Sequence, residues 1–170
     1  MKVAPLLGRL SALNAVLARW ALYVACTCLS GLLAVVVYGV VMRYVFNNAP
    51  SFVEQAALLL VISVAMFAAS AGVRDATHIG LDSLVAILPA PAALACRLLV
   101  QVLTILFALA LVFGGAELAI SLRGDTIPTI GISESFRYAP IVVAGILITL
   151  FSIEHVMALW TGKEVARSWH

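Results

Sequence analysis

The sequence predicts an all-α integral membrane protein with four transmembrane helices and both termini in the cytoplasm. Of its 170 residues, 64% are hydrophobic and 11% are charged, and the mean hydropathy is +1.15. Water-soluble domains carry about a quarter charged residues. Four apolar runs are also long enough to cross ~30 Å of hydrocarbon, which takes about 20 residues in a helix. The chain carries a net charge of only +2 and has no basic patch, so nucleic acid is not an expected partner.

The first two spans lie in the N-terminal half. Residues 20–42 contain no Asp, Glu, Lys, Arg or His. At 1.5 Å per residue this run reaches roughly 35 Å, enough to span with some tilt. Residues 52–73 form the second span and carry Glu54 in the first turn, where an acid suits the helix dipole.

The other two spans lie in the C-terminal half. Residues 92–119 follow Pro91, a residue suited to the first turn of a helix. Residues 138–160 are apolar until Glu154 and His155. We expect all four spans to be helices, because lipid offers backbone groups no outside partner.

Three flanking segments complete a single membrane domain, 1–170. Apolar residues recur at helical spacing in 1–19, as in an amphipathic helix on a membrane surface, and a frayed extension is the alternative. Residues 78–88 predict a short interfacial helix that ends before Pro89, the alternative being a solvated loop with Asp82 as N-cap. Residues 161–170 form a cytoplasmic tail.

The basic residues predict the orientation of the spans, because Lys and Arg are enriched in cytoplasmic connections. With a cytoplasmic N-terminus, seven lie inside and three outside. The inside set is Lys2, Arg9, Arg19, Arg74, Arg97, Lys163 and Arg167, and the outside set is Arg43, Arg123 and Arg137.

Several polar residues at span ends have competing interpretations. Glu54 is either a helix-start acid or a contact for Arg43 or a partner. We expect Glu117 and Glu154 to reach the headgroup region from their span ends. A polar stripe on the third span is either a snorkelling Arg with tolerated neighbours or a protein-facing surface; its members are Arg97, Gln101 and Thr104.

Catalytic, cofactor and metal sites are not expected in this chain. It lacks a phosphate loop, a nucleophile elbow and a zinc-protease motif, and its three cysteines lack zinc-site spacing. The centres of the four spans carry no Asp, Glu, Lys, Arg or His, although transporters usually keep such residues along an ion or substrate path. We therefore expect that the chain does not transport by itself.

The stretch from residue 43 to 89 resembles the small membrane subunit of tripartite ATP-independent periplasmic (TRAP) transporters. That family typically has an Arg after its first span, an aromatic residue and an acidic pair opening the second, and a G-H-I-x-V-D-like signature after it. The matching residues are Arg43, Phe52, Glu54, His78, Ile79, Asp82, Leu84, Leu88 and Pro89. The departures are Phe52 for Trp, Gln55 for the second acid, Thr77 for Gly and Leu81 for Val. Pro128, Tyr138 and Pro140 also resemble the family's connection into its fourth span.

This resemblance implies a scaffold subunit in a bacterial inner membrane. Its implied partners, besides the lipid bilayer, are a large multi-span permease and a periplasmic substrate-binding protein that delivers an organic acid. The large subunit is then expected to hold the sites for substrate and coupling ion, with Na⁺ as the expected ion. His78 and Asp82 are hypothesised to fix the interfacial segment against the membrane or the large subunit, as a docking rather than a catalytic contact.

Two alternative functions belong to other classes. A self-sufficient homodimeric four-helix exporter would need an acid deep in a span, and Glu54 sits near a span end. A four-helix membrane enzyme would need clustered catalytic groups, which the sequence does not show.

Overall fold

The computed structural model describes residues 3–75, 87–127, 129 and 131–161, and most of these lie in four long helices. In chain order they are α1 (Val3–Tyr44), α2 (Phe52–Asp75), α4 (Ala90–Ser121) and α5 (Ala139–Thr161), with a short 3₁₀ helix η1 (Glu134–Arg137) before the last. All four are long and apolar enough to cross a membrane, which confirms the predicted all-α fold and the four spans.

The observed helices extend the predicted spans by a few residues, except at the N-terminus. There α1 runs unbroken for 42 residues, so no break separates the predicted segment 1–19 from the first span. The reason is local, since no Gly or Pro lies between Arg9 and Gly31 to interrupt the helix. The surface location of residues 1–19 stays a prediction, and the predicted helix 78–88 lies almost entirely outside the described residues.

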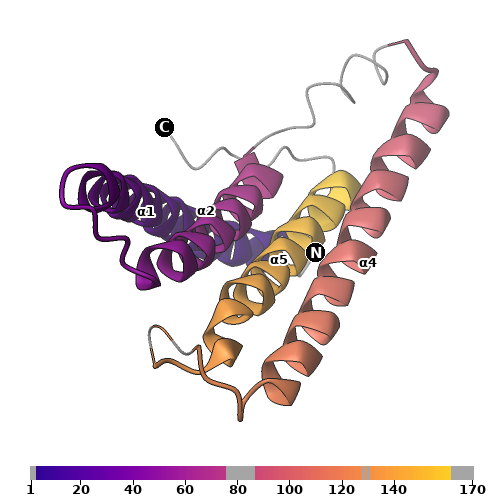
Figure 1. The fold of residues 1–170 in the computed structure, drawn as a ribbon. Helices are drawn as coiled ribbons and strands as arrows, with labels where there is room; N and C mark the ends of the chain where they lie inside the picture. The colour runs from indigo at the N-terminus through magenta and orange to yellow at the C-terminus, as the bar shows by residue number, and fades with distance from the viewer. Residues whose placement is uncertain (1–2, 76–86, 128, 130, 162–170) are drawn as a thin grey trace.

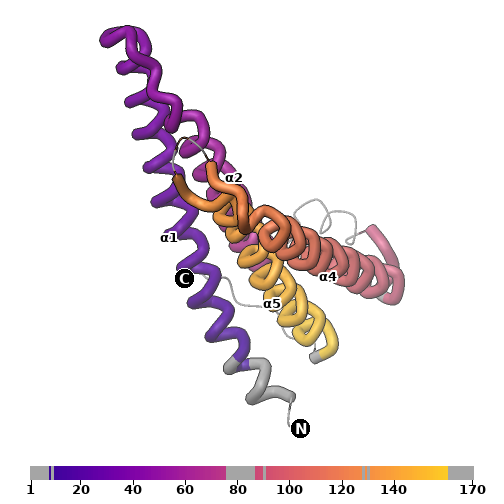
Figure 2. Tube along the Cα trace, turned by 60° about the horizontal axis from the view of Figure 1, so that its bottom comes forward, coloured from indigo at the N-terminus to yellow at the C-terminus, as the bar shows by residue number. Residues whose placement is uncertain are grey.

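The helices lie in the order α1, α2, α5 and α4, and α5 contacts each of the other three. Figure 1 shows α5 between α2 and α4, with α1 beyond α2. The principal contacts of α4 are with α5 and η1, whereas α5 also contacts α2 and α1. Figure 2 shows α1 as one long helix running beside α2. Accordingly α5 is the most deeply buried span and links the α1–α2 pair to α4.

Small residues allow the closest approaches between helices. A Cβ added at Gly39 of α1 would lie 2.6 Å from Cγ1 of Val53 in α2. One added at Gly145 of α5 would lie 2.9 Å from the carbonyl oxygen of Ala108 in α4. Gly39 therefore makes room for the side chain of Val53, whereas Gly145 lets α5 approach the backbone of α4 directly.

Large apolar side chains are exposed along the middle of α1 and α4. On α1 they include Leu29, Leu33 and Val37, and on α4 they include Leu99, Leu103 and Leu106. Apolar residues facing outward suit a lipid environment or the helices of a neighbouring membrane protein.

Candidate functional site: a buried polar cluster

A buried ion pair joins the C-terminal ends of α2 and α5. Nε of Arg74 lies 3.3 Å from Oε2 of Glu154, and Nη2 lies 3.3 Å from Oε1, so the guanidinium contacts both carboxylate oxygens. The side chain of Arg74 is 1% exposed and that of Glu154 is 0% exposed. A two-point Arg–carboxylate contact fixes orientation as well as distance, which suits a rigid connection between two helices.

α1 contributes to the same site from its N-terminal half. Nδ2 of Asn14 donates to Oε2 of Glu154 at 2.7 Å, and Nη2 of Arg74 donates to the carbonyl oxygen of Ser11 at 3.2 Å. Nε2 of His155 lies 3.2 Å from the carbonyl oxygen of Arg74, a hydrogen bond when that nitrogen carries the proton. We call Ser11, Asn14, Arg74, Asp75, Glu154 and His155 the polar cluster.

The polar cluster corrects our expectation for Glu154. Its carboxylate does not reach headgroups but is fully buried between three helices. Arg74 likewise is 3% exposed as a residue, instead of lying in a solvated connection. An unpaired charge at such a position would be very costly, so each buried charge requires the other.

The burial of Asn14 also changes how the N-terminal segment is understood. Asn14 is 1% exposed, whereas Leu13, one of the apolar residues that recur at helical spacing in 1–19, is 60% exposed. Ala18, Ala21 and Ala25 continue the buried side of α1. This part of α1 therefore packs on the bundle through small residues and one amide.

Of the ionisable residues between Arg74 and Asp82, only Arg74 and Asp75 lie within the described part of the chain. Asp75 lies 3.3 Å from Nη1 of Arg74, so it contributes to the polar cluster. His78, Ile79 and Asp82 lie outside the described residues, and their docking role stays a prediction.

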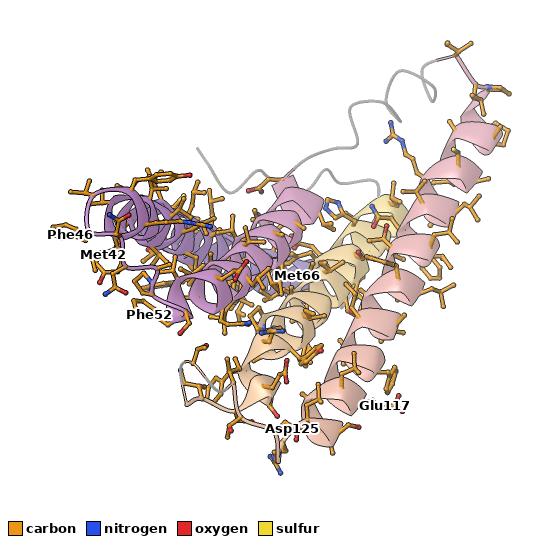
Figure 3. All side chains as sticks on the ribbon, in the orientation of Figure 1. Met42, Phe46, Phe52, Met66, Glu117 and Asp125 are labelled. Atoms are coloured by element: carbon orange, nitrogen blue, oxygen red, sulfur yellow. The ribbon has the colours of Figure 1, made fainter. Side chains whose placement is uncertain are left out.

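Three of the predicted family-motif residues lie at the α1–α2 connection. Arg43 and Glu54 are exposed, and no ion pair joins them within the described part of the chain. Phe52 packs against Tyr38 with ring centroids 6.1 Å apart. Figure 3 shows Phe52, Met42 and Phe46 gathered where the two helices meet. Glu54 therefore lies in the first turn of α2, while contact with a partner stays a prediction.

A second polar contact ties α2 to the segment before α5. Nη2 of Arg137 donates to Oε1 of Gln55 at 2.7 Å, and Nη1 pairs with Oε1 of Glu134 at 3.1 Å. Arg137 is the last residue of η1, and the predicted site residues Tyr138 and Pro140 follow at the junction with α5. The hydrogen bond between Arg137 and Gln55 thus holds the start of α5 against the start of α2.

Gln55→Glu is expected to strengthen this tie. Nε of Arg137 is buried and has no hydrogen-bond partner among the described residues, so a carboxylate at position 55 offers it a second oxygen. Because the Arg137 side chain is 21% exposed, we expect a gain of about 0.5 kcal/mol in the free energy of unfolding. Reversible unfolding in detergent measures it. Ser51→Glu adds a charge just before the same helix without this contact, and an equal gain there would assign the effect to the helix dipole.

The three residues of the predicted polar stripe on α4 differ in their surroundings. Arg97 is exposed, whereas Oε1 of Gln101 is buried within the chain. The hydroxyl of Thr104 donates to the carbonyl oxygen of Val100 in its own helix. A partner-facing role for the three residues stays a prediction, and the position of Gln101 is considered below.

The cluster was detectable in principle from the sequence. Glu154 falls six residues inside the predicted fourth span, and Asn14 interrupts an apolar segment. Ionisable residues within membrane spans usually pair with one another, which predicts a basic partner for Glu154 at the same membrane side without naming it. Across the described residues, no group of three His, Cys, Asp or Glu side chains is arranged to hold a metal ion.

Four helices long and apolar enough to cross a membrane, two of them joined by a buried ion pair, are those of a multi-pass integral membrane protein. Residues 32–162 match the model of a family described as "Tripartite ATP-independent periplasmic transporters, DctQ component". The match covers most of the chain, so the protein belongs to the DctQ family of TRAP transporter components. No curated protein matches the chain. The family match confirms the resemblance seen in the sequence and places the protein in a transport system.

Proposed function

We propose that this chain is the small scaffold subunit of a TRAP transporter in the bacterial inner membrane, with both termini in the cytoplasm. It anchors a large multi-span permease, to which a periplasmic binding protein delivers an organic acid. The large subunit holds the site of the coupling ion, Na⁺, and the substrate site. The small chain itself holds no cofactor.

The observation that carries the scaffold role is where the charges lie. The centres of all four spans lack ionisable acids and bases, and Arg74 and Glu154 near the span ends are paired with each other and buried. A transport path needs polar groups that ions or substrate can reach. Because Arg74 and Glu154 are already used to join three helices, they favour a rigid structural role for the chain.

The test is a mild-detergent pull-down of the tagged full chain from its native membranes, with the bound proteins identified by mass spectrometry. A large permease recovered in stoichiometric amount supports the proposal. Recovery of this chain alone, under conditions where other membrane complexes survive, contradicts it and favours the homodimeric exporter. Transport by the purified chain alone in vesicles would contradict it as well.

The same pull-down tests docking through residues 78 and 82. We expect His78→Ala with Asp82→Ala to reduce the recovered permease severalfold, because both polar contacts to the neighbouring surface are removed. Ser51→Ala with Ser121→Ala, two exposed residues at the opposite membrane side, is the matched control. Unchanged assembly and uptake in the His78 and Asp82 variant would contradict the docking role.

A further inference from the structure

Two buried polar atoms lie on the facing sides of α4 and α5. Ser152 of α5 is 0% exposed, and its hydroxyl oxygen has no hydrogen-bond partner among the described residues. Oε1 of Gln101 on α4 is buried and has no partner in the same part of the chain. Leaving such atoms unpaired in an apolar interior costs free energy, and buried polar groups in native proteins are nearly always hydrogen-bonded.

The helix geometry places both residues in the α4–α5 contact, within one helical turn of each other along the axis. α4 and α5 run antiparallel, because a Cβ at Gly145 would touch Ala108 while one at Gly115 would touch Ile141 and Val142. Gln101 lies seven residues before Ala108, and Ser152 lies seven residues after Gly145. Seven residues are close to two helical turns. Gln101 therefore lies on the same face of α4 as Ala108, and Ser152 lies on the same face of α5 as Gly145. Both therefore face the α4–α5 contact. The contacts of Gly145 with Ala108 and Val112, and of Gly115 with Ile141 and Val142, place Gln101 within one helical turn of the level of Ser152.

We propose that Gln101 and Ser152 form a binding site for one buried water molecule within the α4–α5 contact. The water donates a hydrogen bond to Oε1 of Gln101 and accepts one from the hydroxyl of Ser152. Buried waters in proteins typically make about three such bonds to polar groups that otherwise lack partners. This inference rests on the packing of the chain and is independent of its function in transport.

The site gives the α4–α5 contact a fixed register. The close contact of Gly145 with the backbone of α4 already restricts sliding, and a bridged polar pair adds a directional contact that is lost when either helix moves by one residue. The principal contacts of α4 are with α5 and η1. The register of α4 against α5 therefore determines the position of α4 in the bundle.

A double-mutant cycle on the full chain tests the coupling between the two side chains. The variants are Gln101→Met, Ser152→Ala and the pair together, each unfolded reversibly in mixed detergent micelles. We expect each single change to lower the folding equilibrium constant about threefold, the size typical of polar contacts between membrane helices. The double variant should return to within about twofold of the original chain, because it leaves neither polar atom unpaired.

A matched cycle provides the control. Ser63 is another buried serine, but its hydroxyl donates to the carbonyl oxygen of Leu59 in its own helix, so Ser63→Ala should combine additively with Gln101→Met. Additive losses for Gln101 and Ser152 would overturn the proposal. A structure of the full chain that resolves ordered waters is the second readout. A water within hydrogen-bonding distance of both atoms supports the site, whereas a direct bond between the side chains, or neither, overturns it.

Discussion

Glu154→Ala is expected to lower the free energy of unfolding by about 3–5 kcal/mol, because it removes the fully buried carboxylate that contacts the Arg74 guanidinium at two points and leaves the partly exposed Asp75 as the carboxylate beside that charge. Asn14 loses its 2.7 Å contact at the same time. Native proteins are stable by about 5–15 kcal/mol, so the loss takes a large share of the total and lowers the fraction of chain that is recovered folded. The measurement is the folded fraction of purified protein, followed by denaturant unfolding of what remains folded.

Glu117→Ala is the matched control for the loss of a glutamate. Glu117 is exposed on α4, and Figure 3 shows it on the side away from α5. Within the described residues no ion pair or hydrogen bond holds it, so this change should alter the free energy of unfolding by less than about 0.5 kcal/mol. Equal effects of the two alanine substitutions would contradict the role assigned to the polar cluster.

Removing both charges together separates charge pairing from packing. Arg74→Met with Glu154→Leu replaces the ion pair by apolar side chains of similar size, and such replacements are often neutral or stabilising. We expect the double variant to be more stable than Glu154→Ala by at least about 2 kcal/mol. If it is as unstable as the single variant, the hydrogen bonds to Asn14 and Ser11 hold the helices, rather than the balance of charge.

The fold was predictable because membrane spans can be recognised in a sequence by their length and apolar composition. Lipid requires about 20 apolar residues for each crossing, and the observed α2, α4 and α5 begin and end within two residues of the predicted spans. The continuity of α1 was harder to foresee. Charged residues such as Arg9 and Arg19 suggested a boundary, but they do not interrupt a helix that contains good helix formers on both sides.

The polar cluster was missed because its members are far apart in the sequence. Asn14 and Glu154 are separated by 140 positions, and neither side chain reveals its partner through local spacing. A rule that places charges at span ends in the headgroup region gave the wrong environment for Glu154. The energetic argument that a charge inside a span needs a partner gives the right one.

Gly145→Ala is expected to cost about 1–3 kcal/mol, as overpacking does in a closely packed interior. The new Cβ would lie 2.9 Å from the carbonyl oxygen of Ala108 and 3.2 Å from the backbone nitrogen of Val112. Backbone atoms cannot rotate away as side chains do, so α4 must move off α5. Gly114→Ala is the control, because a Cβ there meets nothing within 4 Å and removes a helix-destabilising glycine. Its free energy of unfolding should stay equal or rise, as denaturant titration in detergent will show.

A second substitution tests whether the backbone or a side chain sets this limit. The Cβ at position 145 would also lie 2.8 Å from Cγ2 of Val112, and Val112→Ala removes that atom. If the carbonyl oxygen of Ala108 is the obstacle, Gly145→Ala combined with Val112→Ala stays as unstable as Gly145→Ala alone or becomes less stable. Recovery to the stability of Val112→Ala alone would show that the side chain was the obstacle. The first result means that only glycine at position 145 permits the close α4–α5 approach, on which the facing positions of Gln101 and Ser152 depend.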